Sequence, residues 1–208
     1  MAKVAKNIGW LFGMLTLFGS YSLWGADVTG QVDGLNNVTP VTALIGSAEA
    51  SNAVSSQTVD QLGPVIVGQM FPTFGGHTLS GGYLSLKELE NHGKYVVVSY
   101  FATWCAPCRV GLPKIERFVN QHDDVVAVYI ALGERQYPSL QRFVNELKIN
   151  SEIVVDKFET IGARHGVAGE GRDTRLPRTF ILNPDGTVRK IFVIEGDDFE
   201  EALENSLK

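Results

Sequence analysis

The chain contains only two cysteines, Cys105 and Cys108, which are separated by Ala106 and Pro107. The pair follows an apolar run and precedes a segment with helical periodicity, so we expect it at a strand-to-helix junction. A helix N-terminus carries unpaired N–H groups and a partial positive charge, which lower the pKa of a cysteine thiol placed there. We therefore expect Cys105 to attack a substrate disulfide and Cys108 to resolve the mixed disulfide. Pro107 suits the first helical turn, where its missing N–H removes no hydrogen bond.

Other uses of the cysteine pair fit the sequence less well. A purely structural disulfide would close a loop of about four residues, which restrains the unfolded chain very little. Structural zinc normally needs about four ligands in a close pattern, and the histidines are scattered, at His77, His92, His122 and His165. The sequence therefore indicates no metal and no cofactor beyond a redox-active Cys105–Cys108 disulfide. A peroxidase is an alternative that nothing in the flanking residues favours.

From about Val65 the sequence predicts strands that alternate with helices. Glycine pairs within residues 71–85 indicate a β-hairpin. The turn Asn183-Pro-Asp-Gly186 indicates a second hairpin near the C-terminus. The sequence predicts strands at 96–101, 125–132, 179–182 and 187–194, and helices that begin at Ser85, the cysteines, Pro138, Asp156 and Asp197. This order indicates an α/β fold with a central mixed β-sheet flanked by helices and an N-terminal β-hairpin extension.

The stretch SYFATWCAPCRVGLP, Ser99–Pro113, resembles the active-site segment of the thioredoxin superfamily. It is most similar to the exported TlpA–ResA-like thiol–disulfide oxidoreductases, which carry a Phe-x-Ala-Thr-Trp-Cys-x-Pro-Cys run. The resemblance covers about Gly68–Leu207 and implies a thioredoxin fold. Pro113 matches the proline that kinks the active-site helix of the superfamily.

The same resemblance implies roles for residues outside the cysteine motif. The segment LPRTFILNPDG matches one in which a cis-proline, here Pro177, faces the dithiol and leaves a backbone edge, here Leu176, free for substrate. The segment YIALGER ends in the position of a cavity glutamate, Glu134. We therefore expect Cys105, Cys108, Glu134 and Pro177 to be catalytic, and Trp104, Ala106, Pro107, Leu176 and Arg178 to bind substrate.

The chain departs from the thioredoxin pattern at Ser99. Cytoplasmic thioredoxins place a buried acid at this position, six residues before the first cysteine, and a serine cannot replace it as a base. We expect Glu134 to act as the proton acceptor instead, with a surface glutamate as the alternative. A second departure is an insertion at 169–178, which contains Arg172, Arg175 and Arg178. These arginines predict either a basic rim beside the dithiol or a solvated loop.

The N-terminal residues read as segments that precede the catalytic domain. In residues 1–26, Lys3 and Lys6 precede an apolar stretch, which predicts a signal peptide or a membrane anchor. Residues 27–64 have no Lys or Arg and predict a flexible tether, with a small β-rich extension as the alternative. Residues 65–208 form the predicted thioredoxin-like domain. Either N-terminal reading places this domain in the periplasm or another extracytoplasmic compartment.

Taken together, these features predict an exported enzyme that reduces specific protein disulfides. The net charge of −5 argues against nucleic acid as a partner. By analogy with the family, the expected partners are disulfide-bearing exported proteins, such as apocytochrome c or copper-assembly proteins, and a membrane electron donor. A disulfide oxidase or isomerase, and a non-enzymatic redox-sensing or copper-handling module, are the alternatives.

Overall fold

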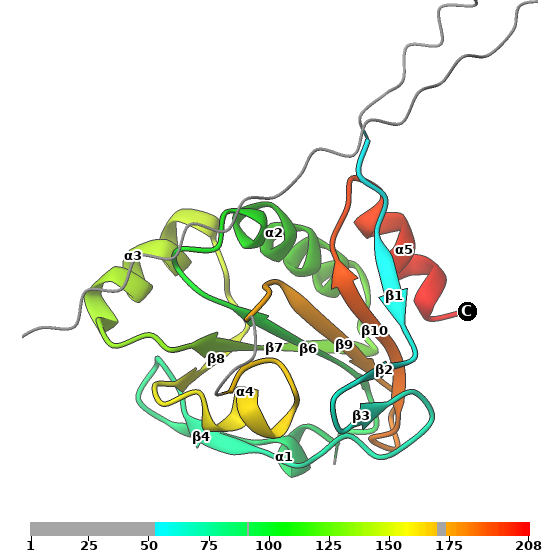
Figure 1. Cartoon of the computed structure of the whole chain (residues 1–208), viewed down its shortest axis with the longest axis horizontal. Coiled ribbons are helices and arrows are strands. Elements are labelled where there is room, and N and C mark those ends of the chain that lie inside the picture. The colour runs from blue at the N-terminus through cyan, green and yellow to red at the C-terminus, as the bar shows by residue number, and fades with distance from the viewer. Residues whose placement is uncertain (1–52, 91, 170–173) are drawn as a thin grey trace, which may run out of the picture. The chain divides into compact units, whose positions relative to one another are not determined.

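A six-stranded mixed sheet forms the centre of the protein, in the order β1-β10-β9-β6-β7-β8 (Figure 1). The computed structural model describes residues 53–90, 92–169 and 174–208. Strands β6, β7 and β8 are parallel, whereas β9, β10 and β1 pair with their neighbours in antiparallel fashion. The strands of this sheet are β1 (Gln57–Val59), β6 (Tyr95–Phe101), β7 (Val125–Leu132), β8 (Glu152–Asp156), β9 (Arg178–Leu182) and β10 (Val188–Ile194).

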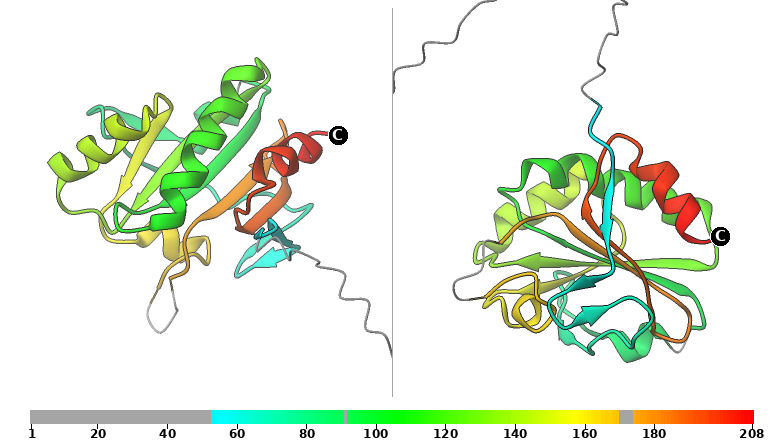
Figure 2. Two further views of the ribbon diagram at one scale, coloured as in Figure 1. Left: turned by 90° about the horizontal axis from the view of Figure 1, so that it is seen from above. Right: turned by 45° about the vertical axis from the view of Figure 1, so that its right-hand side comes forward.

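Helices cover both faces of the sheet, as Figure 2 shows from two further directions. One face carries α2 (Ala106–Gln121), α3 (Tyr137–Leu147) and α5 (Phe199–Ser206). The other carries α1 (Leu86–Glu90), α4 (Thr160–Arg164) and two small hairpins, β2 (Gln61–Leu62) with β3 (Val65–Ile66) and β4 (Gly75–His77) with β5 (Tyr83–Ser85). This arrangement confirms the predicted α/β fold and the hairpin ahead of it.

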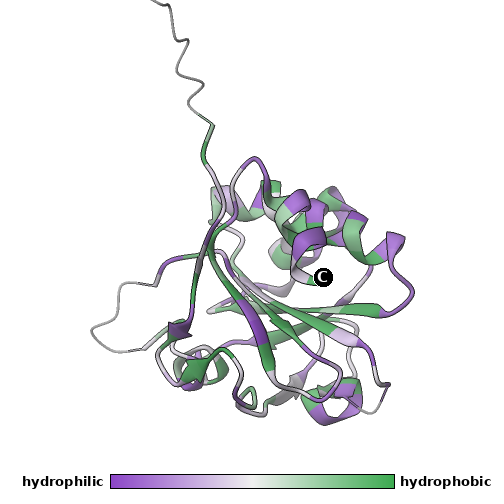
Figure 3. Cartoon of the chain, turned by 90° about the vertical axis from the view of Figure 1, so that its right-hand side faces the viewer, coloured by the Kyte–Doolittle hydropathy of each residue, from purple (hydrophilic) through white to green (hydrophobic). Residues whose placement is uncertain are grey.

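Alternate residues of the central strands fill two separate cores. Val97 and Phe101 of β6 face α2, whereas Val96, Val98 and Tyr100 face α1 and α4. Because both faces are covered, β6 and β7 are apolar almost throughout, as the hydropathy colours of Figure 3 show. The helices carry both colours, since only one side of each contacts the sheet. Ser99 is therefore an exception, a polar residue with 0% exposure on the α2 face of β6.

The predicted tether, residues 27–64, is wrong for its last residues. Strand β1 and strand β2 lie within the segment 27–64, and β1 pairs with β10 at the edge of the main sheet. The alternative of a β-rich extension packed on the domain holds for these residues, because they cover an otherwise open sheet edge. The rest of the predicted tether up to residue 52, and the predicted signal peptide or anchor at 1–26, lie outside the described residues. Among the residues that are described, no helix is long and apolar enough to span a bilayer.

The sequence interpretation also missed strand β8. The sequence predicts a helix that begins at Asp156, but Asp156 ends β8 and the helix begins at Thr160. Glu159 has a positive φ of 59° and makes no capping hydrogen bond, whereas the Asp156 carboxylate accepts from the backbone N–H groups of Thr160 (2.9 Å) and Gly162 (2.8 Å). The apolar run of β8 is short and lies beside a helix-capping signal, so the sequence pattern alone did not identify it as an edge strand.

Candidate active site

The two cysteines form a disulfide where β6 leads into α2. Cys105 is the N-cap of α2, and the backbone N–H of Cys108 points at its sulfur at 3.2 Å. Cys105 is 3% exposed and Cys108 is completely buried. After reduction, the same N–H group and the helix dipole would stabilise a thiolate on Cys105. The geometry therefore supports the predicted order of attack, Cys105 first and Cys108 second.

The residues around the disulfide present an exposed apolar surface. Ala106 and Pro107 of the motif are exposed. Trp104 is 68% exposed and Val110, one turn into α2, is 59% exposed. Large apolar side chains of this kind, gathered around a reactive group, are typical of a contact surface for another protein.

The peptide bond between Leu176 and Pro177 is cis, as the family resemblance implied. Pro177 is buried and shares a cavity of about 350 Å³ with Pro107 and Leu176. Leu176 precedes β9, and among the described residues its backbone makes no hydrogen bond. Its backbone edge is therefore available to a substrate strand, as predicted.

A second groove, of about 490 Å³, lies beside the first and contains Trp104, Leu176 and Arg178. The structure thus brings together three of the predicted substrate-binding residues. The Arg178 guanidinium donates to the carbonyl oxygens of Pro177 (2.7 Å) and Val193 (2.6 Å), so it also holds the wall of the groove in place. Arg172 of the predicted basic rim lies outside the described residues.

Glu134 is buried near the motif, at 8% exposure, which excludes the surface alternative. Its Oε1 accepts the backbone N–H of Thr103 at 2.5 Å. Glu134 therefore holds the turn that precedes Cys105. Its role as proton acceptor stays a prediction.

A different carboxylate, Glu195, lies at the end of β10 and was missed by the sequence interpretation. Its Oε1 lies 2.5 Å from the hydroxyl of Thr179, which in turn lies 2.8 Å from the hydroxyl of Ser99. Oε2 is buried and has no hydrogen-bond partner among the described residues. Burial raises the pKa of Glu195 to about 7, against the lowering effect of the Thr179 hydrogen bond and of the charges on Lys114 and Arg178.

Little in the sequence singles out Glu195. Glu195 stands at the head of an acidic run with Asp197 and Asp198, and both of these are exposed. Only the pairing of Ser99 with Thr179 across β6 and β9 brings the serine to this carboxylate. The one available signal was Ser99, a polar residue inside the apolar strand β6. A buried hydroxyl needs a hydrogen-bond partner, so such a residue indicates a polar group nearby.

On the opposite face of the sheet, a buried polar pair has a structural role. The hydroxyl of Tyr100 is hydrogen-bonded to Nδ1 of His165, and the rings of Phe71 and Phe74 pack against the imidazole. Burial lowers the pKa of His165 to about 4, so this imidazole is neutral at physiological pH.

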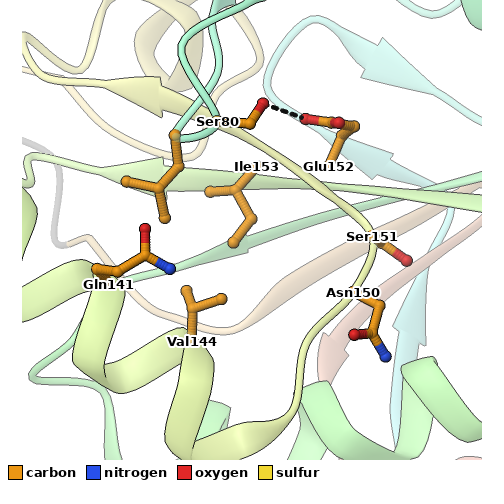
Figure 4. A pocket seen from close by; sticks show the side chains of 8 residues that line it. Ser80, Gln141, Val144, Asn150, Ser151, Glu152 and Ile153 are labelled. Carbon is orange, nitrogen blue, oxygen red and sulfur yellow. Dashed lines mark hydrogen bonds between the residues drawn. The ribbon is translucent and has the colours of Figure 1, made fainter.

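The small pocket of Figure 4, about 150 Å³, contains none of these residues. It lies between α3 and β8, with Gln141 and Val144 on one side and Ile153 on the other. A hydrogen bond of 3.2 Å joins Ser80 to Glu152 at its rim. We assign no function to it.

Comparison with known proteins agrees with this geometry. Residues 67–191 match the AhpC/TSA family. The chain belongs to this family. It is 31% identical to the thioredoxin-like protein YneN of Bacillus subtilis over 129 residues, which cover 61% of this chain and 71% of the relative. It is 29% identical over 143 residues to the thiol–disulfide oxidoreductase ResA of Bacillus anthracis, covering 68% of this chain and 77% of that protein.

Solved structures confirm the thioredoxin fold. A secreted disulfide oxidoreductase of Mycobacterium tuberculosis, homologous to DsbE of E. coli, superimposes with a TM-score of 0.54 at 23% identity. The match covers 64% of this chain and 93% of the mycobacterial chain. The predicted resemblance to the TlpA–ResA-like proteins is thus confirmed by sequence, and the fold by structure.

Proposed function

We propose that this protein, a thiol–disulfide oxidoreductase of the ResA/DsbE type, reduces disulfides of exported proteins through Cys105 and Cys108. The observation that carries the proposal is the position of the disulfide. Its outer sulfur caps a helix N-terminus beside the exposed Trp104 and the free backbone edge of Leu176. A structural disulfide would not need such a surface around it.

In this reaction the Cys105 thiolate attacks one sulfur of the substrate disulfide. A mixed disulfide forms, and the other substrate sulfur leaves as a thiolate. The Cys108 thiolate then attacks the Cys105 sulfur, so that the second substrate sulfur leaves and the Cys105–Cys108 disulfide is restored. The substrate gains two electrons and the enzyme dithiol loses two. A separate electron donor must reduce the enzyme again, and we propose a membrane donor.

The location and substrates belong to the same proposal. Export through residues 1–26, cleaved or retained as an anchor, would place the enzyme outside the cytoplasm, where disulfides persist. The Ala106-Pro107 dipeptide supports a reductant by family resemblance. Apocytochrome c and copper-assembly proteins are the substrates that the resemblance suggests.

The reduction potential of the cysteine pair tests the direction of the reaction. The protein is equilibrated in glutathione or dithiothreitol buffers, and its free thiols are alkylated and counted by mass. A potential near or below about −250 mV supports a reductant, whereas a value near about −120 mV identifies an oxidant and overturns the proposal. In parallel, Cys105→Ser should abolish catalysed insulin reduction, and Cys108→Ser should accumulate the mixed disulfide.

A further inference from the structure

The Cys108 thiol must lose a proton before it can resolve the mixed disulfide, and the Cys108 side chain is completely buried in the oxidised protein. A thiolate is the attacking species in disulfide exchange. The hydroxyl of Ser99 cannot accept a proton at neutral pH. Glu134 is held by the backbone of Thr103. Besides Glu134, which accepts one backbone N–H through Oε1, a carboxylate on the inner side of α2 is a second candidate for the base.

Glu195 lies at that inner side, one helical turn from Cys108. Gly111 follows Cys108 by three residues, about 4.5 Å along the axis, and residues at this spacing share a face of the helix. The Glu195 carboxylate packs so closely against Gly111 that a Cβ there would overlap Oε2. A glycine at this position of α2 thus makes room for a carboxyl group beneath the cysteines.

We propose that the Glu195 carboxylate accepts the proton of the Cys108 thiol when the mixed disulfide is resolved, an inference that rests on the proposed function. Its Oε2 has no hydrogen-bond partner in the described structure, so an acceptor site is free. The chain from Ser99 through Thr179 holds the other oxygen in place. The carboxylate is therefore supplied from the end of β10. Thioredoxins instead supply an acid from the strand that corresponds to β6, at the position of Ser99.

Protons and electrons balance in this step. In the mixed disulfide, Glu195 is ionised and Cys108 is a thiol. The S–H bond breaks as its proton moves to the carboxylate, the Cys108 thiolate forms a bond to the Cys105 sulfur, and the bond from Cys105 to the substrate sulfur breaks. The departing substrate thiolate takes up the proton that leaves Glu195, either directly or through solvent, and this regenerates the carboxylate.

The charged and titratable neighbours of Glu195 are compatible with this role. Lys114 of α2 donates to the carbonyl oxygens of Gly196 (2.9 Å) and Asp197 (3.3 Å), and within the described residues neither Lys114 nor Arg178 forms an ion pair with Glu195. The phenol of Tyr129 on β7 has a pKa well above its ordinary value, chiefly because it is buried, so it stays neutral. Glu116 of α2 interacts with the same phenol. Burial raises the pKa of Glu195 to about 7, so this carboxyl group changes charge near neutral pH.

A two-phase thiol release measures the step directly. The reduced full-length protein is mixed with 5,5′-dithiobis(2-nitrobenzoate): Cys105 releases one thionitrobenzoate, and Cys108 releases a second when it resolves the mixed disulfide. For Glu195→Gln we expect the second phase to slow about tenfold at pH 7. This is less than the roughly 100-fold or more that general bases typically supply, because a thiol is already a fairly strong acid. Above about pH 9 the difference should disappear, since an ordinary thiol with a pKa of about 8.5 ionises without help. The first phase should keep its wild-type rate.

Matched variants separate proton transfer from structural damage. Glu116→Gln removes a buried carboxylate on α2, which accepts from the backbone N–H groups of Asn150 and Ser151, and should leave the second phase unchanged. A second phase that is unchanged in Glu195→Gln, or slowed equally at every pH, overturns the inference. So does a pH-selective loss in Glu134→Gln in place of Glu195→Gln. A wild-type protein that releases no second thionitrobenzoate would instead overturn the proposed function.

A readout that needs no turnover is the titration of the Glu195 carboxyl carbon by NMR. If Glu195 and the Cys108 thiol share a proton, their titrations are coupled, and the Glu195 midpoint should differ between the oxidised and the reduced protein. The same midpoint in both redox states would overturn the inference.

Discussion

The raised pKa of Glu195 makes the stability of the oxidised protein depend on pH in an unusual direction. Its pKa is about 7 in the folded protein and 4.5 ordinarily, so between these values the folded state binds more protons than the unfolded state. The contribution of this group to stability is therefore fully present below pH 4.5 and is lost as pH rises through about 7. Each pKa unit corresponds to about 1.4 kcal/mol, which gives a loss of about 3 kcal/mol by pH 8.

Glu195→Gln removes this titration while it keeps the shape of the side chain and an oxygen that accepts from Thr179. The new buried amide lacks a partner for its N–H groups, which costs about 1–3 kcal/mol at every pH. The informative quantity is therefore the change with pH. Relative to wild type, the variant should gain about 3 kcal/mol in free energy of unfolding between pH 4 and pH 8.

Urea unfolding of both oxidised proteins at pH 4, 6 and 8 provides the measurement. Glu116→Gln, a buried carboxylate bonded to two backbone N–H groups, serves as the control. A stability difference between Glu195→Gln and wild type that stays constant from pH 4 to pH 8 would refute the assigned pKa, and with it the electrostatic description of the site.

Three further predictions follow from burial. Trp104 is 68% exposed, so Trp104→Ala should change the free energy of unfolding by less than about 0.5 kcal/mol yet slow insulin reduction; a clear loss of stability would contradict its role at the substrate surface. The imidazole of His165 should titrate near pH 4, and a midpoint near 6.5 in its ring-proton NMR shifts would show that it is not buried as described. Phe180 is completely buried against Phe71 and Tyr100, so Phe180→Ala should cost about 3–5 kcal/mol in urea unfolding, and a cost below about 1 kcal/mol would show that this core is loosely packed.

Much of the fold was readable from local patterns. The strands 96–101 and 125–132 are long apolar runs with β-branched residues, and they match β6 and β7 closely. The helix at the cysteines starts where Pro107 and the N-cap position predict. These features depend on neighbours in sequence, so a single chain is enough to find them.

The predictions that failed depend on neighbours in space. The assignment of residues up to 64 to a tether overlooked β1, because its three residues become a strand only through pairing with β10. Strand β8 is similar, because it extends the sheet beside β7. The loop of the β4–β5 hairpin covers its outer edge, where the backbone N–H of Leu79 donates to the carbonyl oxygen of Ile153 at 2.8 Å. Local propensity is weak in such short edge segments, and tertiary pairing decides them.

The sequence by itself determined the chemistry of this protein: a cysteine pair with Pro107 before a helix, and a proline at 177 whose cis bond the structure shows. It also showed that the usual acid is missing at Ser99. Only the tertiary structure decided which carboxylates surround the pair, since Glu134 turns to a backbone N–H group while Glu195 reaches Ser99 through Thr179. The physical reason is that the proton affinity of a carboxyl group depends on burial and on hydrogen-bond partners, and both are set by strands far apart in the chain.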